Sequence, residues 1–241
     1  MRMQENWLER TELLIGKENI SKLQNAHILV VGLGGVGAYA AEMLCRAGVG
    51  KMTIIDNDTV HPSNRNRQLI ALNSSNGKSK AELMKLRLED INPQIELIVI
   101  NEFIRDKRTF EILETKFDYV VDAIDTLAPK IFLLEACLQR NIPVISSMGS
   151  GGKMDPSQIQ ITDFSKTYND KLARMLRKRM HKFGIRGGFK VVFSPEPTRK
   201  EAVKFVENEE NKKTTVGTIS YMPPIFGSFM ASEVIKDIIG K

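Results

Sequence analysis

A glycine-rich segment with an acid well downstream is the first feature of this sequence that could do chemistry. Gly32-Leu-Gly34-Gly35-Val-Gly37 follows a predicted strand at residues 27–31 and opens a predicted helix at residues 35–47. Glycines allow a tight turn and let backbone N–H groups approach phosphate oxygens at the positive end of a helix. Asp56 ends the second predicted strand, 19 residues after Gly37 (56 − 37), where an acid can accept hydrogen bonds from ribose hydroxyls. We therefore predict a nucleotide site, although this pattern fits a dinucleotide as well as a mononucleotide.

The segment directly after Asp56 is dense in cations, amides and acids. It and the helix that follows contain Asp58, Ser63, Asn64, Asn66, Arg67, Gln68, Lys78 and Lys80. A dinucleotide does not need so many, whereas a triphosphate does, because charge builds up on the pyrophosphate that leaves during attack at the α-phosphorus. Taken singly, the amides could be turn formers and the lysines solvated helix residues. As a set, these residues favour ATP.

Two further acids follow the fourth predicted strand, residues 119–122. In Asp122-Ala-Ile-Asp125 they stand at the carboxyl end of that strand, the edge at which open α/β sheets bind ligands. Carboxylate oxygens are ligands that Mg²⁺ prefers. We expect one of the two acids to hold Mg²⁺.

Positive charge is concentrated in one stretch. The whole chain carries 35 basic and 29 acidic residues, or +6, whereas residues 166–190 hold nine basic residues and one acid, or +8, which leaves 26 − 28 = −2 for the rest. A patch of this kind attracts polyanions, although a basic helix can also be simply solvated. Tyr168 and Phe183 flank the predicted helix at residues 169–182 and could stack on a nucleic-acid base, but for Phe183 we favour packing against the sheet.

The order of predicted elements gives the fold class. Strands are expected at residues 27–31, 51–56, 95–100, 119–122 and 143–147, with helices between them at residues 35–47, 78–91, 109–115 and 127–140. This alternation predicts βαβ units and a Rossmann-like, doubly wound, mainly parallel sheet. Beyond it we expect strands at residues 158–164 and 189–194, a mobile excursion at residues 196–213 and a closing helix at residues 226–239. The chain is thus predicted to be one domain, with a nucleotide-binding part at about residues 10–147 and a C-terminal β/α elaboration at about residues 148–241.

Composition excludes several classes of protein. Hydrophobic residues make up 42% of the chain and charged residues 27%, which is typical of a globular protein with a sizeable core. No apolar run approaches the ~20 residues that a transmembrane helix needs, and the N-terminus lacks a secretory signal. The two cysteines, Cys45 and Cys137, form no CxxC pair, so we expect a cytoplasmic protein without structural zinc.

The combination of these motifs resembles the ThiF/MoeB/HesA family of adenylating enzymes, which are related to ubiquitin activators. The resemblance rests on the glycine segment, Asp56-x-Asp58, Ser63-Asn-x-Asn-Arg67-Gln68, Lys80 and Asp122-Ala-x-Asp125. It implies an ATP site with Mg²⁺ held by Asp125, with Arg67 and Lys80 as catalytic residues. It also implies that Arg10 reaches into the site of a partner subunit, and hence a homodimer. The implied nucleotide-binding residues are Gly32, Gly34, Gly35, Gly37, Asp56, Asp58, Asn64, Asn66, Arg67, Gln68, Lys80, Asp125 and Thr126.

Within that family, the chain is similar to the tRNA threonylcarbamoyladenosine dehydratases (TcdA, also called CsdL). The similarity rests on residues 149–163, Lys166-Thr, Asp170-Lys-Leu-Ala-Arg174 and Val192-Phe-Ser194-x-Glu196. It implies that ATP activates the threonyl carboxylate of a modified adenosine beside the tRNA anticodon, and that a ring then closes with loss of water. The basic helix would bind the tRNA through Lys171, Arg174, Arg177, Lys178, Arg179 and Lys182.

Two other functions compete with this interpretation. One is adenylation of the C-terminal glycine of a ubiquitin-like sulfur carrier, which the lack of any cysteine after Cys137 disfavours. The other is an NAD-dependent oxidoreductase or a nucleotide sensor, which the Asn66-Arg67-Gln68 cluster and Lys80 disfavour. A cysteine desulfurase or sulfur acceptor remains open as a partner, and none of the three histidines stands out as a general base.

Overall fold

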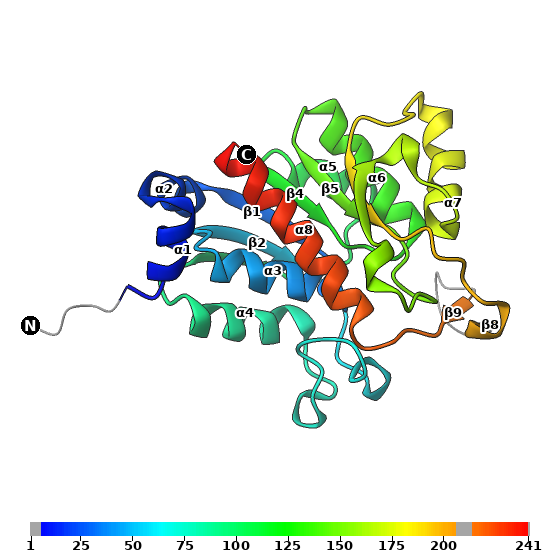
Figure 1. Cartoon of the computed structure of the whole chain (residues 1–241), viewed down its shortest axis with the longest axis horizontal. Helices are drawn as coiled ribbons and strands as arrows, with labels where there is room; N and C mark the ends of the chain where they lie inside the picture. Colours follow the sequence, from blue (N-terminus) through cyan, green and yellow to red (C-terminus); the bar gives the residue numbers. More distant parts are fainter. Residues whose placement is uncertain (1–5, 206–213, 241) are drawn as a thin grey trace, which may run out of the picture.

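A seven-stranded sheet forms the centre of the protein in a computed structural model that describes residues 6–205 and 214–240 (Figure 1). Its strand order is β3-β2-β1-β4-β5-β7-β6, and all neighbours are parallel except β6 with β7. The strands are β1 His27–Val31, β2 Lys51–Ile55, β3 Glu96–Ile100, β4 Tyr119–Asp122, β5 Val144–Ser147, β6 Gln160–Asp163 and β7 Lys190–Phe193. The mainly parallel Rossmann-like sheet is therefore confirmed.

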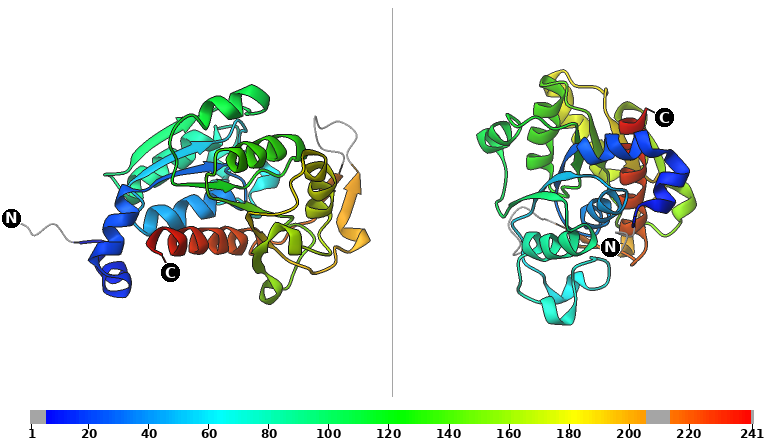
Figure 2. Two further views of the ribbon diagram at one scale, coloured as in Figure 1. Left: turned by 90° about the horizontal axis from the view of Figure 1, so that it is seen from above. Right: turned by 90° about the vertical axis from the view of Figure 1, so that its left-hand side faces the viewer.

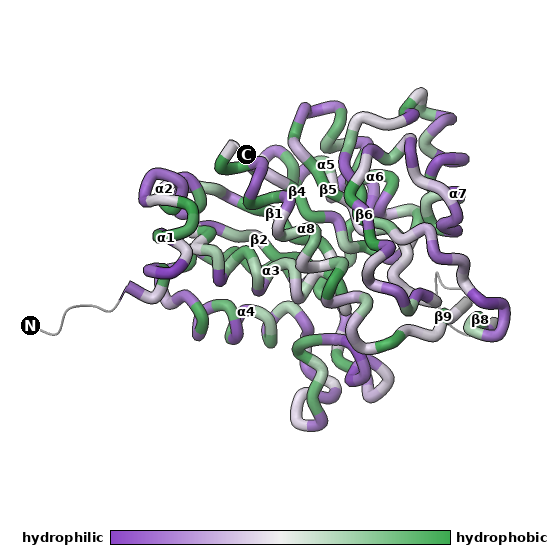
Figure 3. Tube along the Cα trace, in the orientation of Figure 1, coloured by the Kyte–Doolittle hydropathy of each residue, from purple (hydrophilic) through white to green (hydrophobic). Residues whose placement is uncertain are grey.

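Helices cover both faces of this sheet (Figure 2). They are α1 Glu9–Ile15, α2 Lys17–Asn25, α3 Gly37–Arg46, α4 Lys80–Ile91, α5 Asp106–Ile112, α6 Leu127–Gln139, α7 Lys171–Met180 and α8 Met222–Ile239. Because successive side chains on a strand point to opposite faces, Ile28 and Val30 pack with α3, α4 and α8. Leu29 and Val31 pack with α5, α6 and α7 on the other face. Figure 3 shows the apolar strands in the interior and the hydrophilic α7 at the periphery.

The order of the strands fixes where a ligand can bind. From β1 the chain adds β2 and then β3 on one side of the sheet. It then returns to add β4 and the later strands on the other side of β1, so the strand order reverses between β1 and β4. Open α/β sheets bind ligands at this position, at the carboxyl edge where the loops after the two strands diverge, and we call it the crevice. The glycine segment follows β1 and the two acids follow β4, so the topology brings both predicted motifs to this position.

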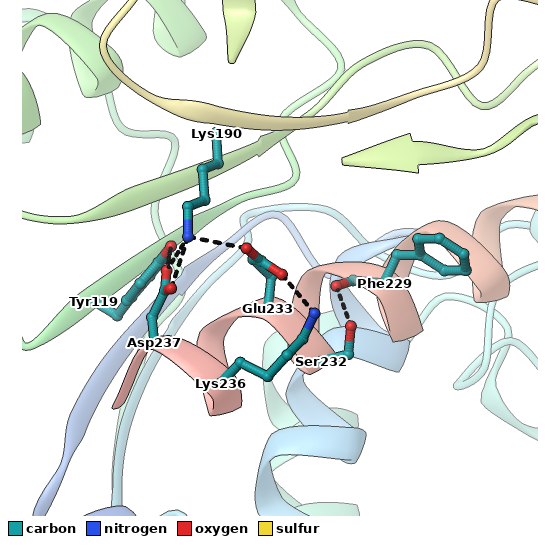
Figure 4. Close-up of polar contacts among 7 residues, drawn as sticks. All are labelled: Tyr119, Lys190, Phe229, Ser232, Glu233, Lys236 and Asp237. Atoms are coloured by element: carbon teal, nitrogen blue, oxygen red, sulfur yellow. Dashed lines mark hydrogen bonds and ion pairs between the residues drawn. The ribbon is translucent and has the colours of Figure 1, made fainter. Parts of the chain in front are cut away.

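Helix α8 is fastened across the sheet by an ionic cluster (Figure 4). The Lys190 ammonium, at the start of β7, lies 2.9 Å from Glu233 Oε1 and 2.6 Å from Asp237 Oδ1. The Tyr119 hydroxyl of β4 donates to Asp237 over 2.8 Å. Two strands and the last helix are thereby joined at the edge of the sheet opposite the crevice.

Most predicted elements lie within a few residues of their observed bounds, and the differences have local causes. The closing helix begins at Met222 rather than near residue 226, because Pro223 and Pro224 stand in its first turn, where no N–H donor is needed. The predicted helix at residues 109–115 is observed as α5, which begins three residues earlier. Part of the predicted excursion pairs as a hairpin of β8 Val203–Phe205 with β9 Thr214–Val216, and residues 206–213 lie outside the described part of the chain.

The N-terminal helix α1 has no buried residue and presents apolar side chains to solvent. Trp7, just before the helix, is 49% exposed, and Leu13 and Leu14 are more exposed still.

In the part of the chain that the structure describes, no helix is long and apolar enough to cross a membrane.

Candidate functional site

The glycine loop joins β1 to α3, and two of its glycines admit no side chain. Gly32 has φ +89°, and a Cβ there would lie 2.9 Å from the carbonyl oxygen of Ala123 in the loop after β4. A Cβ on Gly37 would lie 1.8 Å from the carbonyl oxygen of Gly32. The loop is therefore folded tightly on itself and against the loop after β4, as backbone contact with phosphates requires.

Polar side chains from the segment after β2 surround this loop. A Cβ on Gly35 would lie 3.4 Å from Arg67 Cγ, and one on Gly34 would lie 3.7 Å from Gln68 Nε2. Gln68 is buried, and its Oε1 has no hydrogen-bond partner among the described residues. Because a buried acceptor is normally satisfied, this oxygen fits a ligand that brings donors, as a nucleoside does.

Asp56, the predicted ribose acceptor, is held beside the glycine loop by backbone hydrogen bonds. Its carboxylate accepts hydrogen bonds from the backbone N–H groups of Leu33, over 2.6 Å, and Asp58, over 2.8 Å. Burial raises the pKa of Asp56, and the positive charge of Lys80 opposes that shift. Each carboxylate oxygen still has a lone pair for a ligand hydroxyl.

The two lysines after the segment have different environments. Lys80 is the first residue of α4, its side chain is only 6% exposed, and its ammonium lies 2.7 Å from Asp58 Oδ2. Lys78 is exposed. Lys80 is thus a positioned cation, whereas Lys78 matches the solvated alternative.

The amide and guanidinium groups of residues 64–67 divide in the same way. Asn64 accepts from the backbone N–H of His61 and so shapes its own turn. Asn66 donates to the Thr218 carbonyl over 2.9 Å, which ties the segment after β9 to this site. Arg67 donates to the Ser63 carbonyl and to Asn66 Oδ1. Burial lowers the pKa of the Arg67 guanidinium, and the negative charge of Asp125 opposes this, so Arg67 faces the acid after β4.

Of the two acids after β4, only Asp125 is exposed. Asp122 is fully buried, with Lys130 Nζ at 2.7 Å and Ser146 Oγ at 2.7 Å from its Oδ2. Asp125 is exposed and stands just before Thr126, the residue at the N-terminal end of α6. The described residues contain no cluster of three or more His, Cys, Asp or Glu suited to a metal. One carboxylate nevertheless fits Mg²⁺ bound with a nucleotide, because phosphates and water complete its coordination.

The basic helix α7 has one apolar and one charged face. Ala173, Leu176 and Met180 are buried. The basic residues exposed on the other side, in α7 and the turn after it, are Lys171, Arg174, Lys178, Arg179 and Lys182. Arg177 differs, because its guanidinium donates to the Thr167 carbonyl over 2.7 Å and to the Thr167 hydroxyl.

The aromatic residues that flank α7 are both accessible. Tyr168 is 50% exposed and meets the Phe193 ring edge-to-face, with centroids 5.6 Å apart. The expectation that Phe183 packs against the sheet is wrong, since its side chain is 54% exposed. Phe183 lies in a short 3₁₀ turn, His181–Phe183, which carries it past the last buried residue of the helix.

Arg10 is the one predicted catalytic residue that a single chain does not bring to the site. It is exposed on α1, and the preceding Leu8 packs against Gly48, just past the carboxyl end of α3. The glycine loop lies at the other end of α3, about 15 Å away for a helix of this length.

Two buried lysines near the carboxyl edge were missed by sequence reasoning. Lys130 of α6 pairs with Asp122, and Lys153 donates to the carbonyls of Ser194, over 3.0 Å, and Glu196. Nothing in the sequence marks either as buried, because lysine on a helix or in a glycine-rich loop is normally solvated.

Comparison with known proteins agrees with this geometry. The ThiF family model matches residues 8–241. A Bacillus subtilis tRNA threonylcarbamoyladenosine dehydratase is 42% identical over 95% of this chain and 93% of its own length. An Escherichia coli protein of the same name is 42% identical over 74% of this chain and 68% of its own length. The solved structure of E. coli TcdA in complex with ATP superposes with a TM-score of 0.89 at 34% identity, covering 100% of this chain and 98% of that one. Because the family model covers nearly the whole chain and a relative over almost all of its length is 42% identical, the chain belongs to the ThiF family.

Proposed function

We propose that this protein uses ATP to dehydrate and cyclise threonylcarbamoyladenosine next to the tRNA anticodon. The observation that carries the proposal is that the tight glycine loop, the carboxylate of Asp56, the cations of Arg67 and Lys80 and the exposed acid Asp125 all follow strands at the carboxyl edge beside β1 and β4. Two relatives named for this dehydration are 42% identical to this chain over the aligned residues, and one related structure holds ATP and another AMP.

The arrangement suits adenylation of a carboxylate. Carboxylates are poor electrophiles, and adenylation replaces a very poor leaving group with AMP. A threonyl carboxylate oxygen attacks the α-phosphorus of ATP, the bond to the bridging oxygen breaks, and pyrophosphate leaves. Arg67 and Lys80 lie where they can stabilise the charge that develops on pyrophosphate. Mg²⁺, when bound at Asp125, supplies further neutralisation of phosphate charge.

The second step needs no thiol from the protein. The carbamoyl group of the same side chain attacks the acyl-adenylate, a proton is lost, and AMP leaves with the ring closed. Because the nucleophile is intramolecular, its effective molarity can reach ~10⁵ M or more. Burial raises the pKa of Cys45 to about 12 and also raises the pKa of Cys137, so both thiols stay protonated and enclosed.

The buried thiols also weaken the sulfur-carrier alternative. Drosophila relatives named adenylyltransferase and sulfurtransferase MOCS3 are 31% identical to this chain. The match covers less than half of the length of those relatives. Among residues 6–205 and 214–240, no contact favours thioester transfer. A cysteine desulfurase as a partner therefore stays a secondary proposal, as do a cytoplasmic location and a homodimer.

The decisive experiment measures ATP consumption with two tRNAs. AMP and pyrophosphate are assayed with tRNA that carries threonylcarbamoyladenosine and with the same tRNA that lacks it, while mass spectrometry follows the nucleosides. We expect AMP release only with the modified tRNA, together with loss of one water from the modified nucleoside. Turnover that neither tRNA stimulates would contradict the proposal, and a small carrier protein would be the next substrate to test.

A further inference from the structure

The fully enclosed ion pair of Asp122 with Lys130 lies directly behind the crevice and has no part in the reaction above. Both side chains have 0% exposure, and the Lys130 ammonium lies 2.7 Å from Asp122 Oδ2. Enclosing two charges in this way is costly and rarely stabilises a fold more than apolar residues would. Its position suggests a role other than stability.

The pair determines the course of the chain between β4 and α6. Asp122 ends β4, accepts from Ser146 of β5 over 2.7 Å, and accepts from the backbone N–H of Ile124 over 3.1 Å. Lys130, in the second turn of α6, reaches back and donates to the Ile124 carbonyl over 2.9 Å. Both sides of Ile124, the residue immediately before Asp125, are therefore fixed by this one pair.

The same loop forms one wall of the phosphate loop. The Ala123 N–H donates to the Val31 carbonyl over 2.9 Å, and the Ala123 carbonyl oxygen would lie 2.9 Å from a Cβ on Gly32. A shift of residues 123–125 would therefore alter the distance between Asp125 and the phosphate loop.

We infer that Lys130 is a positioning residue that, through Asp122 and the Ile124 carbonyl, sets Asp125 at the distance from the phosphate loop at which it serves a magnesium–nucleotide complex. The inference rests on the proposed ATP site. It assigns to Lys130 an effect on the magnesium dependence of ATP binding, not on ATP binding as such.

The test is calorimetric measurement of ATP affinity, once with Mg²⁺ and once with EDTA, on six forms of the full chain. These are the wild type, K130M, D122N/K130M, D125N, D125N/K130M and the control K190M, which breaks an ion pair at the opposite edge of the sheet. K130M leaves Asp122 buried without a partner and can fail to fold, whereas D122N/K130M removes both charges and keeps the shapes. Melting temperatures of all six establish that they are folded.

In D122N/K130M we expect the gain in ATP affinity from Mg²⁺ to fall by about 10- to 100-fold, as for other residues that orient metal ligands, with the affinity in EDTA unchanged. D125N should show the same loss, and K130M added to D125N should cause no further loss, because both act through one carboxylate. K190M should keep the full magnesium effect.

Three results would overturn the inference: a wild-type magnesium effect in D122N/K130M, additive losses in the variant that combines K130M with D125N, or an unchanged magnesium effect in D125N. The proposed function fails separately. A protein that binds magnesium–ATP as described, but releases no AMP with modified tRNA, would refute the tRNA reaction and leave the role of Lys130 intact.

Discussion

Single lysines at this site differ in function according to what surrounds them. Lys80 begins α4 with its stem buried and its ammonium against Asp58, and its charge is felt by Asp56. The Lys80 side chain is held without any ligand, so in the proposed ATP complex little conformational entropy would be lost in placing it beside the triphosphate. Lys78, two residues earlier, is exposed and has no such support.

We predict that K80M lowers the rate of ATP–pyrophosphate exchange by about 10²- to 10³-fold, because a preorganised charge beside the leaving group is lost. K78M, the matched control, should stay within about twofold of the wild type, since an exposed lysine contributes little. Exchange assays with substrate tRNA measure both. Equal losses in the two variants would show that charge near the site matters and position does not.

At the scale of elements, a buried acid links helix α3 to α4 in addition to their apolar packing. Glu42 of α3 is buried and contacts Arg46 over 2.8 Å and also Arg87 of α4. Burial alone would raise the pKa of Glu42, but the hydrogen bonds from the two arginines prevail and lower it. Because α3 begins at the glycine loop, this link also helps to fix the direction of the helix that follows the predicted phosphate-binding loop.

A lowered pKa in the folded state means that ionised Glu42 stabilises the protein at neutral pH. That stabilisation is complete above the unfolded pKa of about 4.3 and is lost as the pH falls through the lower folded value. E42Q should therefore lower the free energy of unfolding at pH 7 by about 2–3 kcal/mol, and the difference from the wild type should shrink below about pH 4. Urea unfolding across this range measures the effect. A difference that does not change with pH would mean that packing, and not charge, holds the helices together.

The basic residues of helix α7 have two different environments. Arg177 holds the helix to Thr167, whereas Arg174, Lys178 and Arg179 face solvent. We expect the triple variant R174Q/K178Q/R179Q to weaken tRNA binding and to reduce the magnitude of the slope of log affinity against log salt by about 2–3. The reason is that fewer counterions are released on binding when three phosphate contacts are lost. ATP binding should not change.

The matched control for this experiment is R177Q, which removes one cation from the same helix. It should lower the melting temperature and leave the salt slope nearly unchanged. Filter binding at several salt concentrations compares the two variants. The assignment of α7 to tRNA fails if R177Q changes the slope as much as the triple variant does.

At the scale of the whole molecule, the site of one chain is incomplete if Arg10 is catalytic. Arg10 lies beyond the far end of α3, so only a second copy could bring this residue to the crevice. In a two-fold dimer, each chain would then lend Arg10 to the other.

Mixing two inactive variants tests this sharing. R10A lacks the lent arginine and K80M lacks the cation within its own site, so each alone should be nearly inactive. After equal amounts are mixed and exchanged, half of the dimers are mixed and each has one intact site, which predicts recovery of about a quarter of wild-type activity. No recovery, or full activity of R10A alone, would contradict action across subunits.

Much of the fold could be predicted because the strands are apolar and because the glycine spacing is typical of a tight turn between a strand and a helix. A side chain at Gly32 or Gly37 would clash with backbone atoms, and Asp56 comes directly after a recognisable strand. The sequence alone therefore predicts these three residues as part of the site. The role of Lys130 was not, because its partner lies on another element and burial of a lysine leaves no local signal. Phe183 was misjudged for the converse reason: an aromatic residue near a helix end is usually covered, and here a 3₁₀ turn carries it outward.

The position of the single tryptophan turns the protein into its own spectroscopic reporter. Trp7 is half exposed and lies three residues before Arg10, on the side of the molecule away from the nucleotide crevice. ATP binding to the same chain should therefore leave the fluorescence emission of Trp7 unchanged. A blue shift with rising protein concentration would record a second copy covering α1, without any label.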